Sequence, residues 1–144
     1  MRTWIVDTGP LVAYLDAEDP AHHEVAACWD GFSGRLVTTS AVVTEAMHFV
    51  TADPTGPRHL AELATASGLE VYDLTGPPEL HAAAGMMERY ADTPMDFADA
   101  TLVLLAEALG LEEVLTLDRR GFSVYRLAKK RPFRLVLDME EGPP

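Results

Sequence analysis

The stretch TWIVDTGPLVAYLD, residues 3–16, decides the class of fold. Its first four residues, TWIV, end in three apolar residues, which is typical of a short buried strand, and Asp7 follows directly. The Thr-Gly-Pro sequence at 8–10 predicts a turn, and we expect a short helix from Leu11 to about Ala17. An apolar strand followed closely by a helix is the repeating unit of parallel α/β sheets.

The same alternation of short apolar runs and helical segments continues along the chain. We expect further strands at 35–39, 69–74, 113–118 and 133–138. We expect helices from Pro20, over 41–50 with Ser40 as the cap, from Gly56 to about Ala66, over 77–91, and within 93–110 with Gly110 as the stop. This order predicts an α/β sandwich with a mainly parallel sheet. With no repeat or linker, we expect one domain over 1–138 and a frayed tail at 139–144.

The charge of the chain is unevenly distributed. A net charge of −12 argues against a nucleic-acid partner, yet seven of the eleven Lys and Arg residues lie close together near the C-terminus with no acid between them. They are Arg119, Arg120, Arg126, Lys129, Lys130, Arg131 and Arg134. This segment is either a phosphate-binding edge or a solvated surface element, and the sequence leaves both open.

The composition also limits the compartment and the kind of metal site. A single cysteine, Cys28, excludes an internal disulfide and a thiolate metal site. No apolar run reaches the roughly 20 residues that span a bilayer. The chain starts directly with a strand-like run and shows no pattern of a cleavable signal. We therefore expect a cytoplasmic protein without a membrane partner.

Acidic residues recur where the strands of a parallel sheet should end. Asp7 ends WIVD and Asp118 ends VLTLD, and ligands of open α/β sheets bind at this edge. Turn formation explains either aspartate alone, but both together indicate a shared site. Glu45 lies at the border of the apolar stripe of the helix after RLVTT. A carboxylate there is costly to bury without a cation or hydrogen bonds.

Two aspartates stand three residues apart at the start of the helix in 93–110. Its apolar stripe runs through Ala98, Leu102, Leu105, Ala106 and Leu109. We expect Asp96 to cap this helix. Asp99 lies at the border of the stripe and is poorly explained by capping, so it is the better candidate for a site.

Asp7, Glu45, Asp99 and Asp118 therefore come from strand ends and helix starts that one topology can bring together. Clustered carboxylates have raised pKa values unless cations neutralise them. With oxygen ligands, no cysteine cluster and no compact histidine spacing, the expected ion is Mg²⁺ or Mn²⁺. Such ions activate water for attack on a phosphodiester, and Arg119 and Arg120, which follow Asp118, are the expected phosphate contacts.

With these motifs the sequence resembles the PIN-domain ribonucleases, specifically the VapC-type toxins of type II toxin–antitoxin pairs. The resemblance runs from IVDTGPLVAYLD through TEAMHF and DFADATLVLLAE to LTLDRRGFSVYR. It implies that the four acids are the catalytic metal ligands, with Thr8 and Thr116 in support and Asp96 as an auxiliary ligand through water. It also implies a three-layer α/β/α fold, metal-dependent endoribonuclease activity, a cognate antitoxin and a homodimer.

Two other functions compete with this reading. A PIN-like RNA-binding or assembly module would keep the fold without the chemistry, although an intact set of four acids disfavours it. A receiver-like switch would need a lysine after its last strands and an aspartate at the end of the third. No lysine precedes Lys129, and Asp73 lies within VYDL, so the sequence disfavours the switch.

Overall fold

A computed structural model describes residues 1–139 of the chain. Its centre is a five-stranded sheet in the order β3-β2-β1-β4-β5, and every neighbouring pair is parallel. The strands are β1 (Thr3–Val6), β2 (Arg35–Thr39), β3 (Glu70–Tyr72), β4 (Glu113–Leu115) and β5 (Arg134–Leu135). The parallel sheet predicted from the alternation of strands and helices is thus confirmed.

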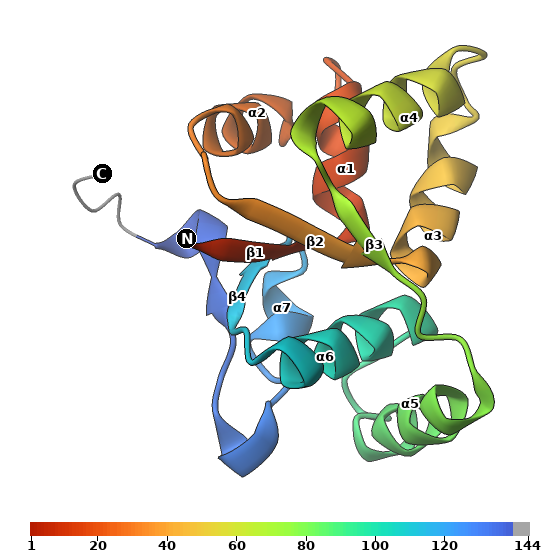
Figure 1. The fold of residues 1–144 in the computed structure, drawn as a ribbon, viewed down its shortest axis with the longest axis vertical. Helices are drawn as coiled ribbons and strands as arrows, with labels where there is room; N and C mark the ends of the chain where they lie inside the picture. Colours follow the sequence, from red (N-terminus) through yellow and green to blue (C-terminus); the bar gives the residue numbers. More distant parts are fainter. Residues whose placement is uncertain (140–144) are drawn as a thin grey trace.

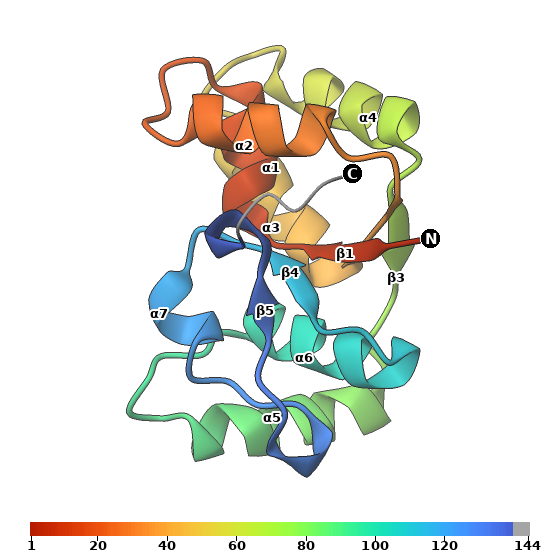
Figure 2. The same ribbon diagram turned by 90° about the vertical axis from the view of Figure 1, so that its left-hand side faces the viewer.

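Helices cover both faces of the sheet (Figures 1 and 2). One face carries α1 (Thr8–Leu15), α2 (His22–Asp30), α3 (Ser40–Val50) and α4 (Gly56–Ser67). The other carries α5 (Pro77–Arg89), α6 (Phe97–Leu109) and the short α7 (Arg119–Phe122). Two 3-10 turns, η1 (Ala128–Lys130) and η2 (Val136–Asp138), flank β5 in the sequence. The three-layer α/β/α sandwich is confirmed.

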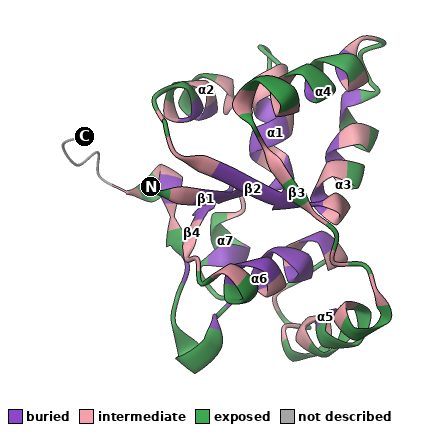
Figure 3. Ribbon diagram, in the orientation of Figure 1, coloured by how far each residue is buried: buried purple, intermediate pink, exposed green. Residues whose placement is uncertain are grey.

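The core lies between the sheet and its helices, as the buried residues in Figure 3 show. β1 and β2 are buried over almost their whole length, as expected for central strands covered on both faces. In α6, residues beyond the predicted stripe are buried, including Ala100, Thr101 and Val103. This wider burial arises because α6 packs on both β2 and α5.

Several element boundaries differ from the sequence-based predictions. α1 begins at Thr8 rather than Leu11, because the Asp7 side chain accepts a hydrogen bond from Thr8 N and starts the helix at once. The cap of α3 is Thr39 rather than Ser40, since the extended Thr39 accepts from Val42 N at 3.4 Å.

The predicted strands 69–74, 113–118 and 133–138 are all shorter in the structure. β4 ends at Leu115, and Asp118 N then donates to Thr116 Oγ1, which turns the chain away from the strand direction. β5 can pair only with this short strand, so it has two residues and continues as η2. β3 pairs with β2 only up to Thr39, where α3 begins.

Within residues 1–139, no helix is both long enough and apolar enough to cross a bilayer. Of the predicted tail, Met139 packs against the core, and residues 140–144 lie outside the described part. The single domain over 1–138 stays a prediction.

Candidate active site

The carboxyl ends of β1 and β4 meet at the point where the direction of chain winding reverses. From β1 the chain proceeds outward to β2 and β3, and it then returns to place β4 on the other side of β1. Ligands of open α/β sheets bind at such a switch point. Asp7 follows β1 and Asp118 lies three residues after β4, and Asp7 N donates to Leu115 O at 3.0 Å.

Asp7 is the most buried of the predicted site acids, with 6% of its surface exposed. Its two oxygens accept from Thr8 N and from Thr116 Oγ1, both at 2.7 Å, so the carboxylate is held on two sides. Burial raises its pKa to about 6, and the charges of Asp96 and Asp118 add to the rise, while the two hydrogen bonds oppose it. The Asp7 carboxylate is therefore held in a fixed position, and its burial destabilises the ionised form.

Asp96 and Asp99 form a reciprocal capping box at the start of α6. Asp99 N donates to Asp96 Oδ1 at 2.8 Å, and Asp96 N donates to Asp99 Oδ2 at 3.1 Å. The prediction that Asp96 caps the helix is confirmed. The prediction that capping poorly explains Asp99 is wrong, because a residue at this third helical position can bond back to the cap.

Capping leaves the Asp99 carboxylate in an unfavourable environment. Burial raises its pKa to about 8, and the charges of Asp7 and Asp96 contribute to the rise. Strongly raised pKa values in a cleft mark candidate functional residues.

Residues from five parts of the fold line one open pocket of about 480 Å³. Asp7, Glu45, Asp99 and Asp118, the four predicted acids, all line it, together with Asp96. Glu45 comes from the middle of α3, whereas other residues that line the pocket come from α1 and α6. Asp118 caps α7 by accepting from Gly121 N at 2.9 Å. The structure thus brings together acids that lie up to 111 residues apart.

The model of the protein family described as PIN domain matches residues 4–130, which is most of the chain. The chain belongs to the PIN domain family. It is 36% identical over 124 residues to the protein named Ribonuclease VapC26 of Mycobacterium tuberculosis, covering 85% of this chain and 91% of that protein.

Two solved structures share the fold of this PIN domain. The crystal structure of Mycobacterium tuberculosis VapC20, described as a Sarcin-Ricin loop cleaving toxin, superposes with a TM-score of 0.70 at 20% identity, over 81% of this chain and 90% of that one. A chain of VapBC2 from Rickettsia felis, bound to a DNA fragment from its promoter, gives a TM-score of 0.64 at 10% identity, over 93% and 98%.

The residues of this PIN domain suit a hard divalent cation. Every charged side chain lining the pocket within the described chain is an acid, so none of them balances the carboxylates. Thr8 lines the same pocket, and its buried Oγ1 has no hydrogen-bond partner among residues 1–139. In that range no three His, Cys, Asp or Glu side chains form a preassembled ligand set. Mg²⁺ fits such a site because it keeps several waters and takes few carboxylates.

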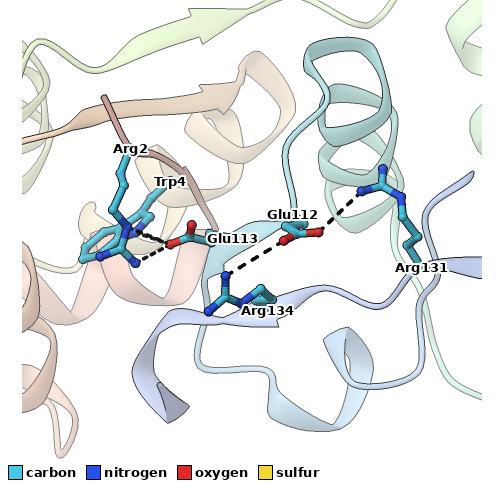
Figure 4. Close-up of polar contacts among 6 residues, drawn as sticks. All are labelled: Arg2, Trp4, Glu112, Glu113, Arg131 and Arg134. Atoms are coloured by element: carbon cyan, nitrogen blue, oxygen red, sulfur yellow. Dashed lines mark hydrogen bonds and ion pairs between the residues drawn. The ribbon is translucent and has the colours of Figure 1, made fainter. Parts of the chain in front are cut away.

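Three of the seven residues of the basic segment form ion pairs away from the pocket. Arg119 Nε donates to Asp138 Oδ1 at 2.7 Å, and its other end reaches Glu24 at 3.4 Å. Arg131 and Arg134 both pair with Glu112, beside the contacts of Arg2 and Trp4 with Glu113 (Figure 4). Neither Arg119 nor the exposed Arg120 lines the pocket.

Asp19 and Phe49 are among the pocket residues that were missed from the sequence. Asp19 adds a further acid from the loop between α1 and α2, where no hydrophobic period marks its orientation. Phe49 lies one helical turn after Glu45 and is 55% exposed at the pocket. Its spacing of four residues from Glu45 was the available signal for a shared helix face.

Proposed function

We propose that this chain is a divalent-metal-dependent endoribonuclease that acts as the toxin of a toxin–antitoxin pair. The observation that carries the proposal is the convergence of Asp7, Glu45, Asp99 and Asp118 in one pocket without a basic side chain. The 36% identity to a protein named Ribonuclease VapC26 supports RNA as the substrate.

The proposed chemistry is hydrolysis of an RNA phosphodiester. Bound Mg²⁺ or Mn²⁺ would supply a Lewis acid and an activated water at neutral pH. Asp7 and Asp99 are the principal proposed metal ligands. Glu45 and Asp118 are the further proposed ligands, and Asp96 would contact the metal through water. Thr116 and Thr8 N orient the Asp7 carboxylate through the hydrogen bonds described above. Thr8, which lines the pocket, also carries the unpartnered Oγ1 as a further oxygen.

The partners follow from the same family membership. We propose a cognate antitoxin as the inhibitor, because the structural relative from Rickettsia felis is a VapBC protein. We also propose a homodimer and a cytoplasmic location, where RNA and the antitoxin are both present.

Replacing Asp7 or Asp99 by asparagine tests the proposed metal ligands. Asparagine keeps the size of the side chain and removes the charge, so we expect RNA cleavage to fall by at least about 100-fold, more than loss of an outer-shell partner costs. The measurement is cleavage of labelled RNA during a Mn²⁺ titration, with circular dichroism to check folding. Asp73→Asn is the matched control, since Asp73 bonds to Thr75 and Ser40 and does not line the pocket.

Cleavage retained in folded Asp7→Asn protein would refute the metal mechanism. If the purified wild-type chain binds RNA but does not cut it at any Mg²⁺ or Mn²⁺ concentration, it is a non-catalytic RNA-binding or assembly module instead.

A further inference from the structure

Tyr125 is fully buried next to the acidic pocket, although it does not line it. Its ring packs edge-on against Tyr90 and Phe122, with ring centroids 5.2 and 5.1 Å away. Apolar packing alone would favour phenylalanine here, because a buried hydroxyl needs a partner. The bonds of this hydroxyl therefore indicate what the tyrosine does.

On one side, the Tyr125 hydroxyl holds the loop that leads into α6. It donates to Pro94 O at 2.9 Å, and Pro94 lies two residues before the α6 cap Asp96. Pro94 O thus has a fixed position just before the capping box. The capping box in turn orients the carboxylates of Asp96 and Asp99.

On the other side, Tyr125 is joined to the turn that presents Asp118. Its backbone N donates to Gly121 O at 3.0 Å, and Gly121 N donates to Asp118 Oδ1 at 2.9 Å. A Cβ at Gly121 would stand 2.3 Å from Asp118 Oδ2 and 2.9 Å from the Tyr125 hydroxyl. Both oxygens therefore approach the same point, and only glycine leaves room for them.

We infer that Tyr125 is a positioning residue that sets the spacing between the Asp96–Asp99 capping box and Asp118 in the metal pocket. Asp99 and Asp118 come from different elements, and Tyr125 connects the supports of both, with its hydroxyl bonded to Pro94 O and its backbone N bonded to Gly121 O. Burial, and the carboxylates of Asp99 and Asp118, raise the pKa of this phenol, so it keeps the proton that it donates to Pro94. The inference rests on the proposed function, because it concerns the same metal site.

The substitution Tyr125→Phe tests this inference, with Tyr90→Phe as the matched control. Both changes remove one hydroxyl from rings that touch each other, and both break one hydrogen bond, since the Tyr90 hydroxyl accepts from Arg126 N at 3.0 Å. Of the two hydroxyls, only that of Tyr125 bonds the loop that leads into the capping box. A purely structural role predicts the same result for both variants.

Two measurements on the full chain separate these outcomes. The first is Mn²⁺ affinity by calorimetry: we expect Tyr125→Phe to bind at least about tenfold more weakly, as for other outer-shell substitutions, and Tyr90→Phe to match the wild type. The second is hydrogen exchange in metal-free protein. We expect faster exchange at the capped amide Asp99 N in Tyr125→Phe, and wild-type rates in Tyr90→Phe.

Unchanged Mn²⁺ affinity and unchanged exchange in Tyr125→Phe would overturn the inference, as would equal losses in both variants. Failure of the proposed function looks different, because the wild type itself would then bind no Mn²⁺. In that case, slower exchange at the Asp99 amide in the wild type than in Tyr125→Phe still supports the positioning role, and an equal rate refutes it.

Discussion

Asp7 and Asp99 both hold a proton more tightly than an aspartate in water, and burial is the largest cause in each case. Neighbouring carboxylates add to the effect, and the described residues around the pocket supply no cation to offset it. In the metal-free protein, these two side chains therefore oppose folding once they ionise. A divalent cation in the pocket would remove that penalty, and its affinity would increase as the carboxylates lose their protons.

The metal-free protein should therefore lose stability as pH rises. The pKa of Asp99 is about 8 in the folded chain and 3.8 as the reference value, so between these the folded state binds more protons than the unfolded state. The free energy of unfolding then falls with increasing pH. We expect urea unfolding in chelator to show this decline from pH 5 to 8, and Asp99→Asn to flatten it, mostly above pH 6.

Asp7→Asn is the internal comparison for this pH experiment. Because the pKa of Asp7 rises only to about 6, its replacement should flatten the lower part of the curve. The expected titration of Asp99 is contradicted if, from pH 5 to 8, the free energy of unfolding of the wild type does not fall more than that of Asp99→Asn.

At the scale of single elements, the first turn of α6 combines helix capping with the candidate chemistry. The side chains that satisfy the free N–H groups at the start of the helix are also the ones that line the pocket. This arrangement fixes the Asp99 carboxylate through a backbone donor, and it places the like charge of Asp96 beside it. Stability and the proposed chemistry therefore depend on the same two residues in different ways.

Two substitutions of Asp96 separate these contributions. Asp96→Asn keeps an oxygen for capping, so we expect stability close to that of the wild type and a lower pKa for Asp99, because one like charge is gone. Asp96→Ala removes the cap and should cost about 1 kcal/mol in urea unfolding. Asp92→Ala, on the exposed loop before α6, is the control. Equal losses of stability in Asp96→Asn and Asp96→Ala would argue against the capping role.

The parallel sheet and the acids that line the pocket could be predicted from the sequence. The ends of the helices and strands, and the contacts of the basic residues, were predicted less well. Strands and acids could be found because hydrophobic period and strand-end position are local properties. The partners of the basic residues are not local: Arg119 meets Glu24, which lies 95 residues away. Tyr125 was missed for the same reason, since its partner Pro94 is 31 residues distant. Unlike Asp7 and Asp118, Tyr125 does not follow an apolar run that predicts a strand.

For the whole molecule, the net charge of −12 opposes the approach of RNA to an acid-lined pocket. Ion pairing further reduces the positive charge that is available to a phosphate backbone. Arg119, Arg131 and Arg134 are neutralised by acids, whereas Arg120, Lys129 and Lys130 form no ion pair within residues 1–139. Of the two arginines predicted to contact phosphate, Arg120 is therefore the one with a free charge next to Asp118.

Replacing Arg120 and Arg119 separately by alanine distinguishes phosphate binding from surface ion pairing. We expect Arg120→Ala to raise the KM for a short RNA and to lower the slope of log KM against log salt by about one. Arg119→Ala should leave that slope unchanged and lower the free energy of unfolding by at most about 1 kcal/mol, because exposed ion pairs contribute little. Arg58→Ala, which breaks the pair with Glu62 on α4, is the control. An equal change of salt slope in Arg119→Ala and Arg120→Ala would mean that the Asp138 and Glu24 contacts open when RNA binds.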